Sequence, residues 1–179
     1  MTTGSSDAPH TRAAAHPDSV GMPNCRSRSF LIARALLRCL HCATIAPVVG
    51  LMLPAGHETL VDSGDSADQH WEAVSCPALL FFIEQFPERV GIRLQRLSPH
   101  YWPDLEDGSA QSYWMNHCAS CGFGHCDTEL YCELDGAFAP ICAGEGAEWE
   151  GVCLLPVSEP CSARASGYAY VVSRHANRY

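Results

Sequence analysis

The sequence contains no lysine, so all 11 of its basic residues are arginines, and 20 acidic residues leave a formal net charge of −9. The acidic excess lies mainly between residues 58 and 159, where 18 acidic side chains accompany 3 arginines. Nucleic-acid-binding proteins gain much of their affinity by neutralising phosphates, which an acidic surface repels. We therefore do not expect a nucleic-acid partner. The opposing feature is a group of arginines that could form a small basic patch: Arg26, Arg28, Arg34 and Arg38.

The sequence also lacks an apolar run long enough to cross a bilayer. Its most apolar stretch, residues 29 to 53, is interrupted by Arg34, Arg38 and His41 before it reaches the roughly 20 residues that a membrane-spanning helix needs. The first thirty residues contain no apolar segment typical of a secretory signal peptide. We expect no membrane association and a reducing, cytoplasmic location, with a disulfide-rich exported protein as the alternative.

Cysteine, by contrast, is abundant, and two pairs have the spacing CxxC. The pairs are Cys39 with Cys42 and Cys118 with Cys121. Two intervening residues let a tight turn aim both sulfurs at one metal ion, and four thiolates complete a tetrahedral Zn²⁺ site. A glycine after the second cysteine permits the positive φ that closes such a turn. Gly122 holds that place in the second pair and Ala43 in the first, so we expect the first turn to be the less favourable one.

Four thiolate ligands leave no open coordination position, so we expect a structural metal and no catalysis at it. No arrangement of nucleophile and base in the sequence supports an enzyme. Two alternatives stay open. The cysteines could be small buried hydrophobes, or they could serve thiol redox chemistry, in which His41 would lower the pKa of a neighbouring thiol. Redox pairs usually begin a helix after a strand, whereas both pairs here lie between expected strands, which favours metal.

Other potential ligands lie near the second pair. Cys126 and Cys132 are six residues apart, so in a strand they would face the same side. They leave a second metal or redox site open. His117 and His125 flank the pair closely, but adjacent ligands would strain a tetrahedral site, so we expect both histidines outside the ligand set or on the surface.

The residues around the first pair predict two strands. Residues 30 to 37 are apolar except for Arg34, and residues 45 to 53 are apolar and partly β-branched. Pro47 lacks a backbone donor, so we expect the second strand to lie at an edge or a bulge there. Residues 54 to 69 contain glycine, serine and aspartate without an apolar stripe, which predicts a surface loop.

A helical insertion is predicted at about residues 75 to 97. Ser75 suits an N-cap and Pro77 a first helical turn, and four apolar residues follow near helical spacing: Leu79, Leu80, Ile83 and Phe86. Pro87 then breaks the pattern, and Val90, Leu94 and Leu97 resume it. We expect a bent helix or a helical hairpin.

Three segments follow from these patterns. Residues 1 to 27 resemble a disordered leader, residues 28 to 142 form a domain resembling a zinc ribbon, and residues 143 to 179 form a C-terminal extension that includes apparent strands at 152 to 157 and 168 to 172. Residues 113 to 117 are expected to form the short strand before the second cysteine pair. The predicted fold class is α+β: an antiparallel β-sheet with a helical insertion between the two cysteine pairs.

The run Tyr-Trp-Met-Asn-His-Cys-Ala-Ser-Cys-Gly at residues 113 to 122 resembles a group of bacterial proteins with an inserted zinc ribbon. The similarity continues through Asp127, Leu130, Glu133, Asp135, Gly136, Phe138 and Pro140. Residues 46 to 49, Ala-Pro-Val-Val, are similar to the strand that follows the first CxxC pair in that group. The resemblance implies a zinc ribbon and brings no activity with it. Cys126 and Cys132 depart from the pattern.

These observations predict a non-catalytic protein with a structural zinc ion held by Cys39, Cys42, Cys118 and Cys121. A protein-binding or adaptor role is the leading expectation, with a protein as the partner. The alternative is a thiol redox or metal-responsive protein that uses the paired cysteines. These two classes differ in one observable, because a structural site should keep its zinc under mild oxidant whereas a sensor should release it.

Overall fold

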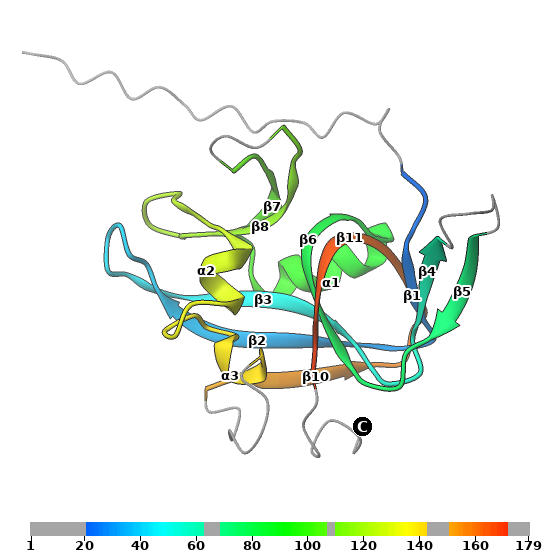
Figure 1. Ribbon diagram of the computed structural model, residues 1–179. Helices are drawn as coiled ribbons and strands as arrows, with labels where there is room; N and C mark the ends of the chain where they lie inside the picture. The colour runs from blue at the N-terminus through cyan, green and yellow to red at the C-terminus, as the bar shows by residue number, and fades with distance from the viewer. Residues whose placement is uncertain (1–20, 63–68, 107–109, 143–150, 172–179) are drawn as a thin grey trace, which may run out of the picture.

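The computed structural model describes residues 21–62, 69–106, 110–142 and 151–171, and most of its regular structure is antiparallel β-sheet (Figure 1). Eight strands form one sheet in the order β10-β2-β3-β6-β11-β1-β4-β5, and three form a second in the order β7-β8-β9. The strands are β1 Cys25–Ser27, β2 Phe30–Arg38, β3 Ile45–Leu53, β4 Glu58–Asp62, β5 Gln69–Ala73, β6 Ala78–Gln85, β7 Tyr101–Asp104, β8 Tyr113–His117, β9 Gly124–His125, β10 Cys153–Val157 and β11 Cys161–Tyr170.

The helices are few and short. They are α1 Glu88–Leu97, α2 Asp127–Tyr131 and α3 Ala139–Cys142. Among the described residues, no helix has the length and apolar character needed to span a bilayer.

The hairpin of β2 and β3, called the central hairpin below, lies between β10 and β6 in the larger sheet. Both strands lie where the sequence predicts them. The pairing runs from Leu31 opposite Met52 to Arg38 opposite Ile45. Neighbouring residues of these strands enter two different hydrophobic clusters, with Ile32 in one and Leu31 in the other. Because side chains alternate across a strand, the half of this hairpin away from its tip is buried on both faces, which explains the nearly continuous apolar sequence there.

Residues 78 to 85 form strand β6 and not the first half of a helical insertion. They pair with β11 along nearly the whole strand and with β3 at its start. Leu79 and Leu80 are both fully buried, but they belong to opposite clusters. A strand covered on both faces carries apolar residues at nearly every position, and some of them fall at helical spacing by chance.

The second half of the expected insertion is a helix. Helix α1 begins directly after Pro87 and ends at Leu97, and its buried Val90 and Leu94 pack into the same cluster as β3. The spacing of these apolar residues therefore identified this helix correctly.

Segments expected to lie outside the sheet contribute strands to it. Strand β4 lies within the predicted surface loop of residues 54 to 69, and β1 lies within the predicted leader, where Cys25 is fully buried. Strands β10 and β11 lie in the expected C-terminal extension. β11 pairs with β1 through residues 161–163 and with β6 from residue 164 onward. Residues 1–20, 63–68, 107–109, 143–150 and 172–179 fall outside the described part, together with the predictions made for them.

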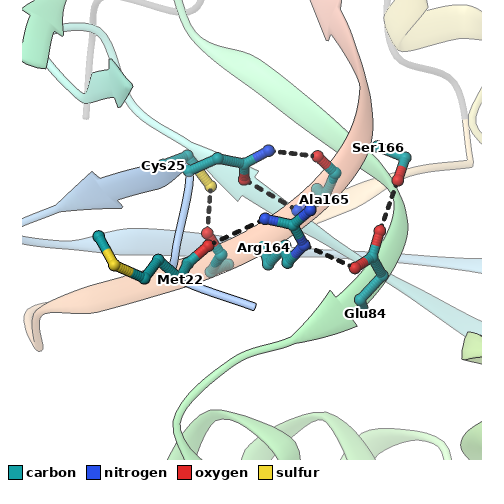
Figure 2. A network of polar contacts seen from close by, with 8 residues as sticks. Met22, Cys25, Glu84, Arg164, Ala165 and Ser166 are labelled. Carbon is teal, nitrogen blue, oxygen red and sulfur yellow. Dashed lines mark hydrogen bonds and ion pairs between the residues drawn. The ribbon is translucent and has the colours of Figure 1, made fainter. Parts of the chain in front are cut away.

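A polar network fixes the irregularity in β11 where its partner changes (Figure 2). The Arg164 Nε donates to a carboxylate oxygen of Glu84 at 2.8 Å, and the Ser166 hydroxyl donates to the other oxygen at 2.6 Å. Arg164 also donates from Nη1 to the carbonyl of Met22 at 3.1 Å. One carboxylate on β6 therefore holds both sides of the irregular step, and the same arginine ties down the chain before β1.

The carboxamide of Asn116 joins the two sheets. Its Nδ2 donates to the carbonyl of Val49 at 2.9 Å, and its Oδ1 accepts the amide hydrogen of Val49 at 2.9 Å. Val49 already pairs with β2 on its other side, so this side chain takes the place of a neighbouring strand. Asn116 is 1% exposed, which makes these two hydrogen bonds the substitute for water at Val49.

The same geometry explains why Pro47 is tolerated in β3. Hydrogen-bonding directions alternate along a strand, so Pro47, two residues before Val49, also directs its backbone away from β2. Its carbonyl accepts a hydrogen bond from the Ser98 hydroxyl at 3.1 Å. β6 pairs with β3 only at Met52 and Leu53, so no strand of the described chain requires a donor from Pro47. The expected edge position is confirmed.

We predict that Asn116→Ala lowers the free energy of unfolding by about 2–4 kcal/mol, because it leaves both backbone groups of Val49 buried without partners. Urea denaturation of the metal-loaded protein measures the change. Gln69→Ala, at an exposed position of β5, is the control, and we expect a change within about 0.5 kcal/mol. Equal stability of the two variants would contradict the role given to Asn116.

Candidate metal centre

The structure brings together the four cysteines that the sequence singles out. One sulfur from each lies within 4.8 Å of the other three. The Sγ atoms of Cys39 and Cys121 are 3.7 Å apart, and those of Cys42 and Cys118 are 3.5 Å apart. Zn–S bonds of about 2.3 Å in a tetrahedron place sulfurs roughly 3.8 Å apart, whereas a disulfide needs about 2.05 Å. The separations fit a shared metal ion, and the described cysteines form no disulfide.

Two hairpins of the same shape present the four sulfurs. The first joins β2 to β3 and the second joins β8 to β9. In the first, the amide of Cys39 donates to the carbonyl of Thr44 at 2.9 Å. In the second, the amide of Cys118 donates to the carbonyl of Phe123 at 2.8 Å. The matching bonds close both turns in the same way, so each pair aims its sulfurs at a common point.

The residue after each pair adopts a positive φ, as expected from the spacing. Gly122 has φ 74° and Ala43 has φ 62°. The left-handed conformation costs a residue with a Cβ atom about 1–2 kcal/mol relative to its usual regions. The first turn is therefore closed at a backbone cost that the second avoids.

Electrostatics within the cluster favours a cation at its centre. The hydroxyl and amide of Thr44 lower the pKa of Cys42 to about 6. At Cys121, a hydrogen bond from the Phe123 amide lowers the pKa, but burial and the neighbouring thiols outweigh it and raise the pKa to about 12. One thiolate thus forms readily, and its negative charge disfavours ionisation of the neighbouring thiols. A divalent cation removes that opposition, because a coordinating thiol is deprotonated outright.

Aromatic and imidazole side chains pack around the cluster. His41 and Phe123, one from each hairpin, stack with centroids 5.8 Å apart. His117 is 3% exposed, stacks on Trp102 at 4.0 Å and reaches a carboxylate oxygen of Asp104 with Nε2 at 2.9 Å. His125 is equally buried. Neither His117 nor His125 belongs to the four-sulfur group, as expected, but both are buried and so the surface alternative is wrong.

Cys126 and Cys132 do not face the same side of a strand. They stand at the two ends of helix α2, where the Cys126 sulfur accepts a hydrogen bond from the amide of Glu129 at 3.4 Å. Burial raises the pKa of Cys126, which disfavours its reactive thiolate. Within the residues that the structure describes, no second group of three or more metal-ligating side chains occurs.

Helix α2 begins with a buried carboxylate, at a position that the resemblance includes but for which the sequence predicted no role. Asp127 is 3% exposed, and its carboxylate accepts the amide hydrogen of Phe82 at 2.6 Å. Phe82 has φ 48°, so the carboxylate supports a backbone conformation that a phenylalanine rarely adopts. Burial raises the pKa of Asp127 to about 7. This contact ties α2 to β6 and thereby supports the chain that follows the second hairpin.

Sequence reasoning identified all four sulfur donors but missed the residues that hold them in register. Asn116 was part of the motif without a role, and Thr44 was not singled out. The only signal was their position directly beside the cysteine pairs, since a polar residue on an otherwise apolar strand commonly satisfies a buried backbone group.

Comparison of the chain with protein-family models, with curated proteins and with solved structures gives no match.

We predict that Ala43→Gly raises the free energy of unfolding by up to about 1 kcal/mol, because glycine adopts a positive φ without steric cost. The matched variant is Gly122→Ala, which should lower it by about 1 kcal/mol, since a Cβ atom there meets nothing within 4 Å and only φ opposes it. Denaturant titration of both zinc-loaded variants checks this. A stabilised Gly122→Ala or a destabilised Ala43→Gly would contradict it.

Proposed function

We propose that this protein is a non-catalytic zinc-binding protein in which Cys39, Cys42, Cys118 and Cys121 hold one structural Zn²⁺ in an arrangement of the zinc-ribbon type. The observation that carries the proposal is the approach of four sulfurs from two matching hairpins to tetrahedral separations. Four thiolates select zinc among the common structural metals of small protein sites and leave no position for substrate.

The metal would join the ends of two hairpins that the Asn116 carboxamide already links further along their strands. Cys39 and Cys118 are each 2% exposed, so the metal's inner side faces protein. Its outer side is formed by the hairpin ends, where Cys121 is exposed. Such a site stabilises the position of the hairpin of β8 and β9 against the hairpin of β2 and β3, because the apo cluster offers only weak thiol contacts in its place.

We further propose a protein-binding role for the surface at this end of the molecule, here called the ribbon tip: Leu36, Leu40, Ile45 and Phe123. Leu40 is 72% exposed, Leu36 65% and Ile45 59%. Leu36 and Ile45 share the face of the hairpin that also carries the exposed Arg34 and Arg38. Exposed apolar side chains next to two arginines favour a protein partner that offers apolar side chains flanked by acidic ones.

We predict that Cys39→Ser and Cys118→Ser each reduce bound zinc from one ion per chain to almost none and lower stability. Losing one of four thiolates removes much of the affinity of a closed site. Native mass spectrometry of protein purified under reducing conditions counts the ion. Cys153→Ser is the matched control, because Cys153 is an exposed cysteine outside the cluster. Equal zinc content in all three variants would exclude the assignment.

The second candidate is a thiol redox or metal-responsive protein. It is favoured by the 3.5 Å between the sulfurs of Cys42 and Cys118, which need only a small approach to form a disulfide. Dilute hydrogen peroxide added to the same zinc-loaded protein separates the two. Retention of zinc with free thiols supports a structural site, whereas zinc release with disulfides between the hairpins supports a sensor.

The protein-binding role predicts position-specific crosslinking. A photoreactive amino acid replacing Leu40 should capture one acidic partner protein in cells, while the same replacement of Leu134 should not. Leu134 is the matched control, because it is a fully exposed leucine in the turn after α2. Capture should also fail when Arg34 and Arg38 are changed to glutamate. The same products from both positions would contradict a specific surface at the ribbon tip.

A further inference from the structure

A second feature lies at the other end of the central hairpin. A pocket of about 690 Å³ opens among the chain before β2, the chain after β3, β4, β5, the start of α1 and the start of β11. Its charged lining residues are Arg26, Arg28, Glu58 and Arg89. Strand β2 separates the pocket from the cysteine cluster by 9 residues, or about 30 Å at 3.3 Å per residue. Figure 1 shows β1, β4 and β5 at the end of the hairpin away from its tip.

The pocket is basic in a chain that is acidic overall. It contains three arginines and one carboxylate, that of Glu58, whereas the whole chain has a net charge of −9. Arg26 is committed to protein contacts, because its Nε lies 2.6 Å from the Glu58 carboxylate and its guanidinium lies 4.1 Å from the centroid of the Trp71 ring. The remaining positive charge comes from Arg28 and Arg89.

These two arginines keep donors available. Arg28 has no ion-pair or hydrogen-bonding partner among the residues that the structure describes. Arg89, in the first turn of α1, uses one Nη2 donor on the carbonyl of Pro160 at 2.9 Å, which positions its guanidinium at the pocket wall. A guanidinium has five N–H donors in a planar fork that matches an oxyanion. The hydroxyls of Ser27, Ser29 and Ser162 line the same space and add further donors.

The pocket is suited to binding and not to covalent chemistry. The cysteine that lines it, Cys161, is 2% exposed, and burial raises the pKa of that thiol to about 12. The thiol therefore stays protonated near neutral pH. The pocket also has the size of ordinary small-molecule sites, which occupy about 300–1,000 Å³, so it has room for more than a free oxyanion. Pro54, Ala55 and Pro160 supply an apolar wall.

We propose that this pocket binds a small molecule carrying a phosphate monoester, with the phosphate between Arg28 and Arg89 and the organic part against Pro54 and Pro160. Arginine forks recognise phosphate through paired, charge-assisted hydrogen bonds. The doubly charged monoester matches two guanidiniums that are outside ion pairs better than a single carboxylate does. The site is independent of the zinc cluster, so it adds a ligand-binding function to a protein whose other end is held by metal.

The test is isothermal titration of the full-length, zinc-loaded protein with glucose 6-phosphate, inorganic phosphate and succinate at one fixed ionic strength. We expect glucose 6-phosphate to bind at one site per chain and more tightly than the other two probes. Arg28→Gln and Arg89→Gln should each weaken that binding at least about tenfold. The matched control is Arg96→Gln, at an exposed arginine in the last turn of α1 outside the pocket, which should leave binding unchanged.

Each other result would overturn the proposal. Tighter binding of succinate would identify a dicarboxylate, and not a phosphate monoester, as the ligand class. Equal binding of inorganic phosphate would show that the organic part of the ligand contributes nothing. Equal losses in Arg28→Gln and Arg96→Gln would indicate non-specific charge attraction, and no binding by any probe would exclude the site. Zinc content measured in the same samples shows whether a variant has lost the metal, so a failure of the zinc assignment is recognised separately.

Discussion

The pairing of the Asn116 carboxamide with the backbone of Val49 is the contact on which the metal centre depends. Asn116 lies two residues before Cys118, and Val49 lies in the strand that follows Cys42. A displacement of either strand by one residue would turn the carboxamide away from Val49 and move one hairpin end past the other. The two hydrogen bonds therefore set the register in which four sulfurs can meet. Since both partners are buried, breaking these hydrogen bonds would cost more free energy than forming them contributes, because the backbone groups of Val49 would be left unpaired.

The rest of the fold supports this register from both sides. The central hairpin is covered on one face by α1 and on the other by α2 and the chain leading to α3, with separate hydrophobic clusters for each face. The buried Asp127 connects α2 to β6 through the Phe82 amide. Such a sheet has a core of its own, so the four-cysteine cluster lies at one end of a formed structure. The arginine-lined pocket lies at the end of the central hairpin away from the cysteines, beside β1, β4 and β5.

Local patterns predicted the elements whose surroundings are simple. Strands β2, β3 and β8 and helix α1 lie where apolar spacing, proline positions and cysteine turns indicated. The prediction failed for β6, because burial on both faces removes the alternation that identifies a strand. It also failed for β4, whose polar sequence fits a hairpin at the sheet edge as well as it fits a loop. For Cys126 and Cys132, spacing assumed a strand where the chain forms helix α2.

The sequence by itself determined which four cysteines form the cluster and the conformation of their turns, including the unfavourable φ at Ala43, because CxxC spacing and the residue after it act over a few bonds. Only the tertiary structure decided that the two pairs meet, that Asn116 replaces a strand, and that arginines from two distant segments line one pocket. Asn116 and Val49 are 67 positions apart in the sequence, and Arg89 and Pro160 are 71 positions apart. Contacts of that kind follow from how strands are ordered in the sheet, and no local pattern of residues encodes that order.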